Sequence, residues 1–306
     1  MRARKHRGTK PAGELLGADL ANLISGYLDH LQDRAYVTSV VSRAPIAELG
    51  RTLASMLRSG DRQAATDAAQ FAQDAVIFGL SPAFAEYFPR SPVLRALREN
   101  LSAADYFTRH QSIKTLGRVG PRSNAQYLAA VFPWFLEHDP LNLDDLLGEL
   151  FWLSRRARRE PYLDAIVTAP LYLARWTILG HLLDHGTYAY PGWVNGRPSG
   201  YVLGYVERLA QDPHRWVRAE ATWRLTQLEA SDAVRAHPIS GMESNREPSP
   251  TFFTLWLQVG NYLWTSSRRD YDVQLVERIA AYVGEHPPYS GMNIDAYWAE
   301  FGSYPG

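Results

Sequence analysis

The sequence contains no cysteine, and this absence excludes several kinds of chemistry. Without thiols the chain forms no disulfide, carries no thiolate nucleophile and offers no cysteine ligand to zinc. The absence fits a reducing compartment, so we expect a cytoplasmic protein. No apolar run approaches the roughly 18 residues that a membrane span needs. The basic residues 1–11 are not followed by the apolar segment of a secretory signal, so we expect no membrane partner.

The chain also lacks net charge, because 32 Lys and Arg balance 32 Asp and Glu. The balance is uneven along the chain: residues 1–160 carry 21 basic against 17 acidic side chains, and residues 161–306 carry 11 against 15. A dedicated duplex-binding domain is usually more basic. The charge therefore weighs against nucleic acid, although a local basic stripe remains open.

A third absence is that of strand patterns. Alternation of apolar and polar residues never persists between turn signals, whereas apolar residues recur at helical spacing in about a dozen segments. The chain has 306 residues, of which 46% are hydrophobic, so it can bury a sizeable core. We therefore predict an all-α fold of helices in antiparallel pairs.

Residues 199–228 carry the clearest pattern, that of two short helices joined by a tight turn. The second helix places a stripe of apolar residues on one face: Val217, Ala221, Leu225 and Leu228. Asp212 before Pro213 is typical of a helix N-cap followed by proline, and Arg218 can reach back over the turn to a carboxylate. Such a unit buries its apolar face only against a neighbour of the same kind.

This pattern resembles a HEAT repeat, and the resemblance covers about thirty residues. It implies an α-solenoid whose concave face often holds a protein or nucleic-acid partner. Residues 91–120 offer a second unit, in which Arg109 and Leu116 lie 109 positions before Arg218 and Leu225, about three repeat periods. There a Ser-Ala-Ala turn replaces Asp-Pro. Compact helical packing without repeats is the structural alternative.

The resulting domain organisation has five parts. We expect a disordered basic tail over residues 1–11, a HEAT-like helical domain over 12–230 and a polar loop over 231–250. A terminal helix pair over 251–286 then packs on the solenoid, and residues 287–306 form an aromatic tail. The tail is interpreted either as a partner surface or as a segment docked on the rest of the chain.

One pattern could hold a metal ion. His181 and His185 lie four residues apart and share a helix face, with Asp184 beside them. A catalytic zinc needs a further ligand, for which the sequence offers no distinctive candidate. The pattern also stands at a helix end, where a histidine suits the helix dipole, so the structural interpretation is favoured over a metal site.

Acidic residues form the candidate catalytic group: Asp144, Asp145 and Glu149. Aspartates near a helix start stabilise the helix dipole, which is the simpler explanation. The catalytic interpretation depends on Trp152, Trp176 and Trp193 in neighbouring segments. HEAT-like DNA glycosylases hold a base between tryptophans and an aspartate, and this chain is similar only in fold type and in having such residues.

Arginines and aromatic residues are the candidate binding groups. A positive groove would need Arg109, Lys114, Arg118 and Arg122 to lie on one side, whereas the run at residues 155–159 suits a helix C-terminus. Aromatic residues are enriched at binding hot spots. We expect a partner to contact the following residues: Arg109, Arg218, Trp152, Trp176, Tyr190 and Trp193.

The functional hypotheses follow from this architecture. The first is an interaction module, not an enzyme, that binds a protein partner on its concave face. The second is a HEAT-like DNA-binding protein or DNA glycosylase, and the third a metal-dependent or biosynthetic helical enzyme. No P-loop, dinucleotide-binding glycine motif, GxSxG or HExxH occurs, so we expect no cofactor. The oligomeric state is left open.

Overall fold

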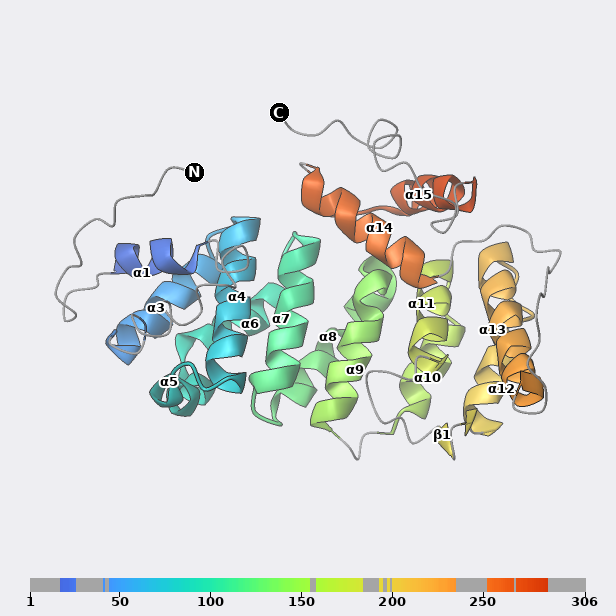
Figure 1. Cartoon of the computed structure of the whole chain (residues 1–306), viewed down its shortest axis with the longest axis horizontal. Helices are drawn as coiled ribbons and strands as arrows, with labels where there is room; N and C mark the ends of the chain where they lie inside the picture. Colours follow the sequence, from blue (N-terminus) through green and yellow to red (C-terminus); the bar gives the residue numbers. More distant parts are fainter. Residues whose placement is uncertain are drawn as a thin grey trace. The chain divides into compact units, whose positions relative to one another are not determined.

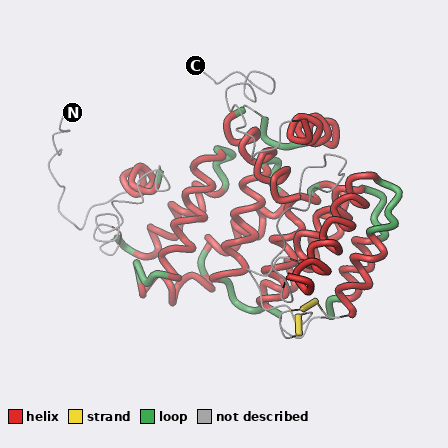
Figure 2. Tube along the Cα trace, turned by 45° about the vertical axis from the view of Figure 1, so that its right-hand side comes forward, coloured by secondary structure: helices red, strands yellow, loops and turns green. Residues whose placement is uncertain are grey.

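The computed structural model describes residues 17–25, 41, 44–154, 158–183, 193–194, 197–198, 200–234, 252–266 and 268–285. Over these ranges it contains 14 α-helices, with short 3-10 turns between some of them (Figures 1 and 2). The all-α prediction is confirmed. Two strands of two residues each, β1 (Trp193–Val194) and β2 (Arg197–Pro198), pair antiparallel, although the sequence predicted no strand.

The helices belong to two compact units. One comprises residues 1–131 and 149–155, and the other comprises residues 132–148 and 156–306. The division falls within α8 (Asn124–His138) and α9 (Leu143–Leu153), so each of these helices contributes residues to both units. Pro133 does not end α8, since the helix continues to His138.

The first unit is built from two successive helix pairs. The pair α3 (Ile46–Leu57) and α4 (Arg62–Ile77) is followed by the pair α6 (Pro92–Glu99) and α7 (Tyr106–Val119). First helices pack together, α3 on α6, and second helices pack together, α4 on α7. The helix α1 (Gly17–Ile24) packs on α3 and α4, while α5 (Pro82–Tyr87) and the 3-10 turn η2 (Phe88–Arg90) connect the two pairs.

Capping residues explain where these helices begin. Asp61 caps α4, since its carboxylate accepts a hydrogen bond of 2.7 Å from the Ala64 N–H. Gly60 has φ +73°, a left-handed conformation that glycine adopts without steric cost. Ser81 and Ser91 cap α5 and α6, and each serine is followed by proline at the first helical position.

The second unit repeats the paired arrangement. The pair α10 (Glu160–Val167) and α11 (Tyr172–Leu183) precedes the pair α12 (Gly200–Leu209) and α13 (Arg215–Val234). Again the first helices of the two pairs pack together, α10 on α12, and so do the second helices, α11 on α13. The helix α13 continues to Val234, so residues 231–234 of the predicted polar loop are helical.

The last two helices cover part of this second unit. The helix α14 (Phe252–Thr265) packs on α11 and pairs with α15 (Val273–Glu285). Among the described residues, the buried apolar side chains that the two helices contribute are Leu255, Val259, Leu263, Leu275, Val276, Ile279 and Ala280. The 3-10 turn η4 (Pro140–Asn142) also lies against α11, where the Thr177 hydroxyl donates to the Pro140 carbonyl at 2.9 Å. Burial on several sides explains why α11 is apolar around almost its whole circumference.

Candidate interaction surface

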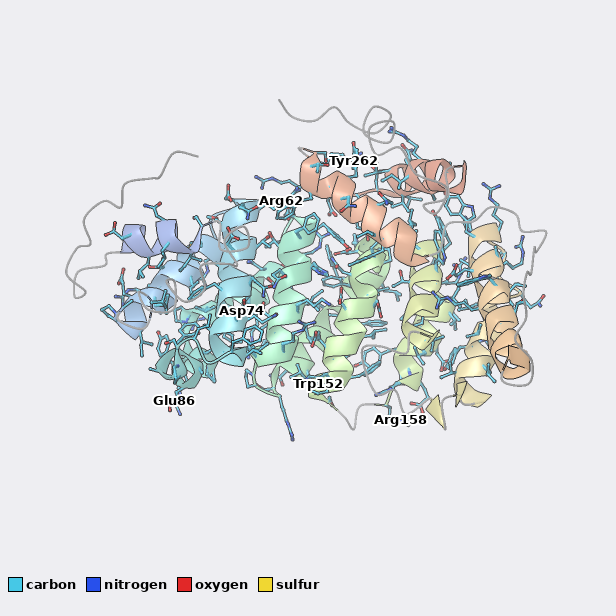
Figure 3. All side chains as sticks on the ribbon, in the orientation of Figure 1. Arg62, Asp74, Glu86, Trp152, Arg158 and Tyr262 are labelled. Carbon is cyan, nitrogen blue, oxygen red and sulfur yellow. The ribbon has the colours of Figure 1, made fainter. Side chains whose placement is uncertain are left out.

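Large apolar side chains are exposed at the ends of two helices of the first unit. Phe78, which directly follows α4, is 59% exposed, and Ile77 beside it is also exposed. Trp152, in the last turn of α9, is 53% exposed and was a predicted binding residue (Figure 3). Exposed tryptophan and phenylalanine leave apolar surface in water that burial by a partner would remove.

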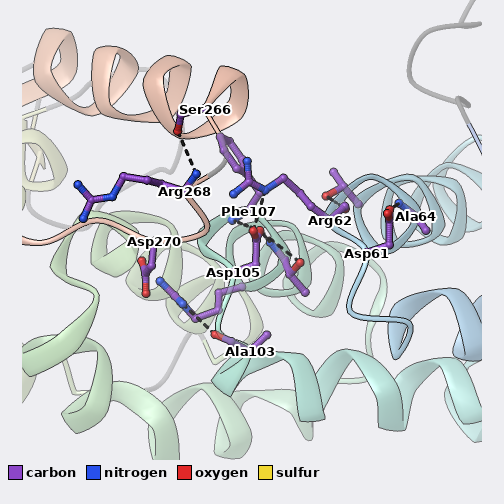
Figure 4. Close-up of polar contacts among 12 residues, drawn as sticks. Asp61, Arg62, Ala64, Ala103, Asp105, Phe107, Ser266, Arg268 and Asp270 are labelled. Carbon is purple, nitrogen blue, oxygen red and sulfur yellow. Dashed lines mark hydrogen bonds and ion pairs between the residues drawn. The ribbon is translucent and has the colours of Figure 1, made fainter. Parts of the chain in front are cut away.

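The hydrogen bonds between α4 and α7 fix how these helices run. Near their starts, Arg62 Nε donates to the Asp105 carboxylate at 2.7 Å (Figure 4). Farther along, Gln111 Nε2 donates to Gln70 Oε1 at 2.9 Å. Residue numbers increase together along both helices, so α4 and α7 are parallel, and Phe78 lies at the same end as the C-terminus of α7.

The helix α9 meets the same end of α7 through Glu149. Its carboxylate is buried, and Arg118 Nε lies 3.4 Å from Glu149 Oε1. A Cβ built on Gly117 would overlap the Glu149 side chain, so only glycine allows this close approach of the helices. Since Trp152 follows Glu149 by three residues, it lies about one turn farther along, beside the end of α7.

The end of α7 also carries two exposed cations. The Arg118 side chain is 42% exposed, and Arg122 in the turn before α8 is exposed without an ion pair to any described residue. We call the surface formed by Ile77, Phe78, Arg118, Arg122 and Trp152 the α7 edge. The condition for a positive groove of four cations is not met, because Arg109 is only 1% exposed.

Arg109 and Arg218, both predicted binding residues, make the same backbone contact. Arg109 Nη1 donates to the Ala103 carbonyl at 2.8 Å, and Arg218 Nη1 donates to the Asp212 carbonyl at 2.6 Å. Each bond spans six residues back over the turn that precedes its helix. The equivalence drawn from the offset of 109 residues therefore extends to a hydrogen bond that stabilises the turn.

The expected contact of Arg218 with a carboxylate is corrected by the structure. The Asp212 carboxylate is occupied by Arg175 of the preceding helix pair, whose Nε donates to Oδ2 at 2.6 Å and whose Nη2 donates to Oδ1 at 3.1 Å. Arg218 therefore reaches the carbonyl of Asp212 instead.

Asp212 Oδ1 also accepts from the His214 N–H at 2.7 Å, which closes an Asx turn ahead of the helix. The predicted N-cap at Asp212 with Pro213 at the first helical position is wrong, because α13 begins at Arg215 and its first backbone bond runs from the Arg218 N–H to the His214 carbonyl.

Arg175 is the most informative residue that the sequence analysis missed. Its Nη1 donates to the Ala169 carbonyl, six residues back, as Arg109 and Arg218 do in their own turns. Arg175 lies on the second helix of its pair, α11, and bonds Asp212, which precedes the second helix of the next pair, α13. Arg62 on α4 bonds Asp105 before α7 in the same way. The sequence spacing could have identified it, because Arg175 lies 43 residues before Arg218, which is about one repeat period.

The predicted tryptophans fall in different environments. Trp176 is fully buried on α11, where its ring centroid lies 5.5 Å from that of Trp216. Trp193 lies in β1, but its side chain is outside the described part, as is the whole of Tyr190. Of the predicted aromatic anchors that the structure describes, only Trp152 is exposed.

A cluster of aromatic and ionisable groups surrounds Tyr172, at the start of α11. The His214 ring stacks on Tyr172 with 3.7 Å between centroids, and neither the Tyr172 hydroxyl nor His214 Nδ1 hydrogen-bonds a described residue. Burial, together with the Glu277 carboxylate of α15, raises the pKa of Tyr172. Burial also lowers the pKa of His214, and this effect outweighs the opposing carboxylates of Asp212 and Glu277.

The acidic and metal-binding candidates do not gather into one site. Asp144 and Asp145 lie in the first turn of α9, as the helix-dipole interpretation requires, whereas Glu149 is buried against Gly117. The backbone of His181 belongs to α11, but its side chain is outside the described part, as are Asp184 and His185. Among the described side chains, no group of three or more potential ligands could hold a metal ion.

Comparison with known proteins adds no family assignment. No protein-family model, curated protein or solved structure matches this chain. Over the described ranges, no helix combines the length and apolar character that a bilayer crossing requires.

Proposed function

We propose that the chain is a HEAT-like α-solenoid that acts as an interaction module for a protein partner. The packing of first helix on first and second on second within each unit supports a repeat architecture. The arginines that bond back over their own turns, Arg109, Arg175 and Arg218, support it further, because the same contact recurs in three helix pairs. The function does not follow from the architecture, since repeat folds serve many functions.

The observation that carries the proposal is the exposure of Trp152 and Phe78 on the α7 edge. Tryptophan is among the residues most enriched at interface hot spots, where it fills a pocket of the partner. Arg109 and Arg175 are buried, and the exposed Arg218 donates to the carbonyls of its own turn, so the aromatic side chains are the better candidates for contact. A catalytic interpretation has less support, because the carboxylate nearest to Trp152 along α9, that of Glu149, is buried beside Arg118.

The test is retention of partners by the immobilised full chain. Extract from the source cells is passed over wild type, Trp152→Ala and Phe78→Ala, and retained proteins are quantified by mass spectrometry. We expect at least one protein to be lost about thirtyfold on Trp152→Ala, the effect of removing a hot-spot residue. Trp264→Ala, at another exposed tryptophan on α14, is the matched control and retains it.

Two results would contradict the proposal. One is an identical set of retained proteins on wild type and Trp152→Ala. The other is retention of duplex DNA that falls steeply as salt is raised, which would favour the nucleic-acid hypothesis.

A further inference from the structure

We propose that the α7 edge binds an acidic segment of a partner, in which an aromatic or aliphatic anchor stands within about three residues of Asp or Glu. This inference rests on the proposed function and specifies the chemistry of the partner. It is drawn from the charge, the burial and the register of the helices that meet at this edge.

The exposed charge of the α7 edge has one sign. Three segments form the edge: residues 77–80 after α4, 118–123 at the end of α7, and 149–154 at the end of α9. They contain two basic side chains, Arg118 and Arg122, and both are exposed. Their single carboxylate is that of Glu149, which is buried. An incoming carboxylate therefore meets exposed cations and no exposed anion of these segments.

Arg118 is held in place by the buried carboxylate. Its Nε faces Glu149 Oε1 at 3.4 Å, while two fifths of the side chain stays open to solvent. A guanidinium has five N–H donors in a fixed plane, so one edge can face Glu149 while the other receives a second carboxylate. Fixing the side chain in advance lowers the entropy lost on binding.

The register sets the spacing of the recognised segment. Arg118 contacts Glu149, and Trp152 lies one helical turn beyond Glu149, about 5–6 Å between Cβ atoms. Allowing for the length of the Glu149 side chain, the cation and the Cβ atom of the aromatic anchor are within roughly 12 Å of each other, a distance that three to four residues of extended chain span at about 3.3 Å each. An acidic residue and an apolar anchor separated by two or three residues fit both groups at once.

A peptide is favoured over nucleic acid on two grounds. Duplex affinity comes largely from many Lys and Arg contacts to phosphates, and this edge offers only Arg118 and Arg122. The apolar part of the edge, Ile77, Phe78 and Trp152, includes an aliphatic side chain that provides no stacking surface for a base. Apolar anchors flanked by charge match the composition of a protein interface with its polar rim.

The experiment measures peptide binding to the full chain by fluorescence anisotropy. Three pools of labelled dodecapeptides carry Trp, Phe or Leu at a central anchor position. The positions three residues before and after the anchor are fixed as Glu in one pool, Gln in the second and Lys in the third. We expect the Glu pool to bind about five- to tenfold more tightly than the Gln pool, and the Lys pool to bind most weakly.

Variants separate the charge from the anchor. Arg122→Gln lowers affinity for the Glu pool by about threefold and leaves the Gln pool unchanged, since one exposed charge pair is lost. Arg51→Gln removes one positive charge from an exposed side chain of α3, elsewhere in the unit, and leaves the affinity for both pools unchanged. Trp152→Ala weakens binding of both pools by about thirtyfold.

The outcomes distinguish this inference from the proposed function. Equal affinities for the Glu and Gln pools, both lost on Trp152→Ala, would overturn the acidic specificity while the interaction module stands. Competition of the Glu pool by an oligothymidylate that itself binds the α7 edge would overturn the inference in favour of nucleic acid. Binding of every pool that is insensitive to Trp152→Ala would overturn it as well. If cell extract then also yields no Trp152-dependent protein, the proposed function fails too.

Discussion

The Arg175 guanidinium on α11 donates two hydrogen bonds to the Asp212 carboxylate, which stands at the turn before α13. Both side chains are almost completely buried, and Arg175 also donates to the Ala169 and Pro170 carbonyls of its own turn. One arginine thus stabilises its own turn and connects it to the next helix pair. A buried charge persists only when it is paired and hydrogen-bonded in this way.

Removing Arg175 is expected to destabilise the protein strongly. Arg175→Met leaves the Asp212 carboxylate buried without its cation, so the free energy of unfolding should fall by about 3–5 kcal/mol, measured by urea denaturation. Arg51→Met breaks the exposed pair with Glu48 and should cost less than about 1 kcal/mol. Equal losses in the two variants would show that the buried pair has no special role.

A glycine pair tests the close approach of α7 and α9. Gly117→Ala places a methyl group on the Glu149 side chain and should destabilise by about 1–3 kcal/mol. Gly204→Ala, inside α12, meets no atom within 4 Å and should stabilise by about 0.5–1 kcal/mol through helix propensity. Thermal unfolding of both variants is the measurement, and a neutral Gly117→Ala would argue against the described packing.

The sequence predicted the helices well because their signals are local. The sequence placed helix pairs over residues 91–120 and 199–228, and the structure has α6 with α7 and α12 with α13 there, although α13 continues to Val234. It could not predict which residues pair across helices. The pairing of Arg175 with Asp212 depends on how successive pairs stack, and no spacing within one helix encodes that stacking.

The stack of His214 on Tyr172 predicts a pH dependence. Burial lowers the pKa of His214, so the unfolded chain binds a proton more readily than the folded one. The associated stability is complete above the unfolded pKa of about 6.5 and is lost as pH falls toward the lower folded pKa. His214→Phe keeps an aromatic ring without the titration, so its unfolding free energy should fall less between neutral and mildly acidic pH.

The measurement is a series of urea denaturations between about pH 7 and pH 5, the range that spans the ordinary histidine pKa. Asp212, Glu277, Arg175 and Arg215 face His214 and remain in the variant, so any change of slope belongs to the imidazole. The same replacement at the exposed His138 serves as control. Identical slopes for wild type and His214→Phe would contradict the assignment.

Tyr271 connects the α14–α15 segment to η4 within the second unit. Its hydroxyl donates to the buried Asp139 carboxylate at 2.8 Å and accepts from the Leu141 N–H at 3.0 Å. Tyr271→Phe removes both bonds and should cost about 1–3 kcal/mol, with faster hydrogen exchange at the Leu141 amide. Tyr127→Phe, at an exposed tyrosine whose hydroxyl bonds no described residue, should leave both quantities unchanged.

The interaction surface was only partly predictable for a physical reason. Trp152 was a candidate from composition, yet Trp176 and Arg109 were equally plausible, and burial alone separates them. Phe78 gave no signal, because a phenylalanine after a helix is as often core as surface. Exposure depends on how many neighbours pack around a residue, which a single sequence does not specify.

Quantitative partner capture by wild type and Trp152→Ala decides whether the α7 edge is the binding surface. We expect the two forms to unfold at nearly the same temperature and at least one protein retained by wild type to be lost about thirtyfold on the variant. A variant that folds equally well and retains every protein to the same extent would contradict the assignment of the α7 edge as the binding surface.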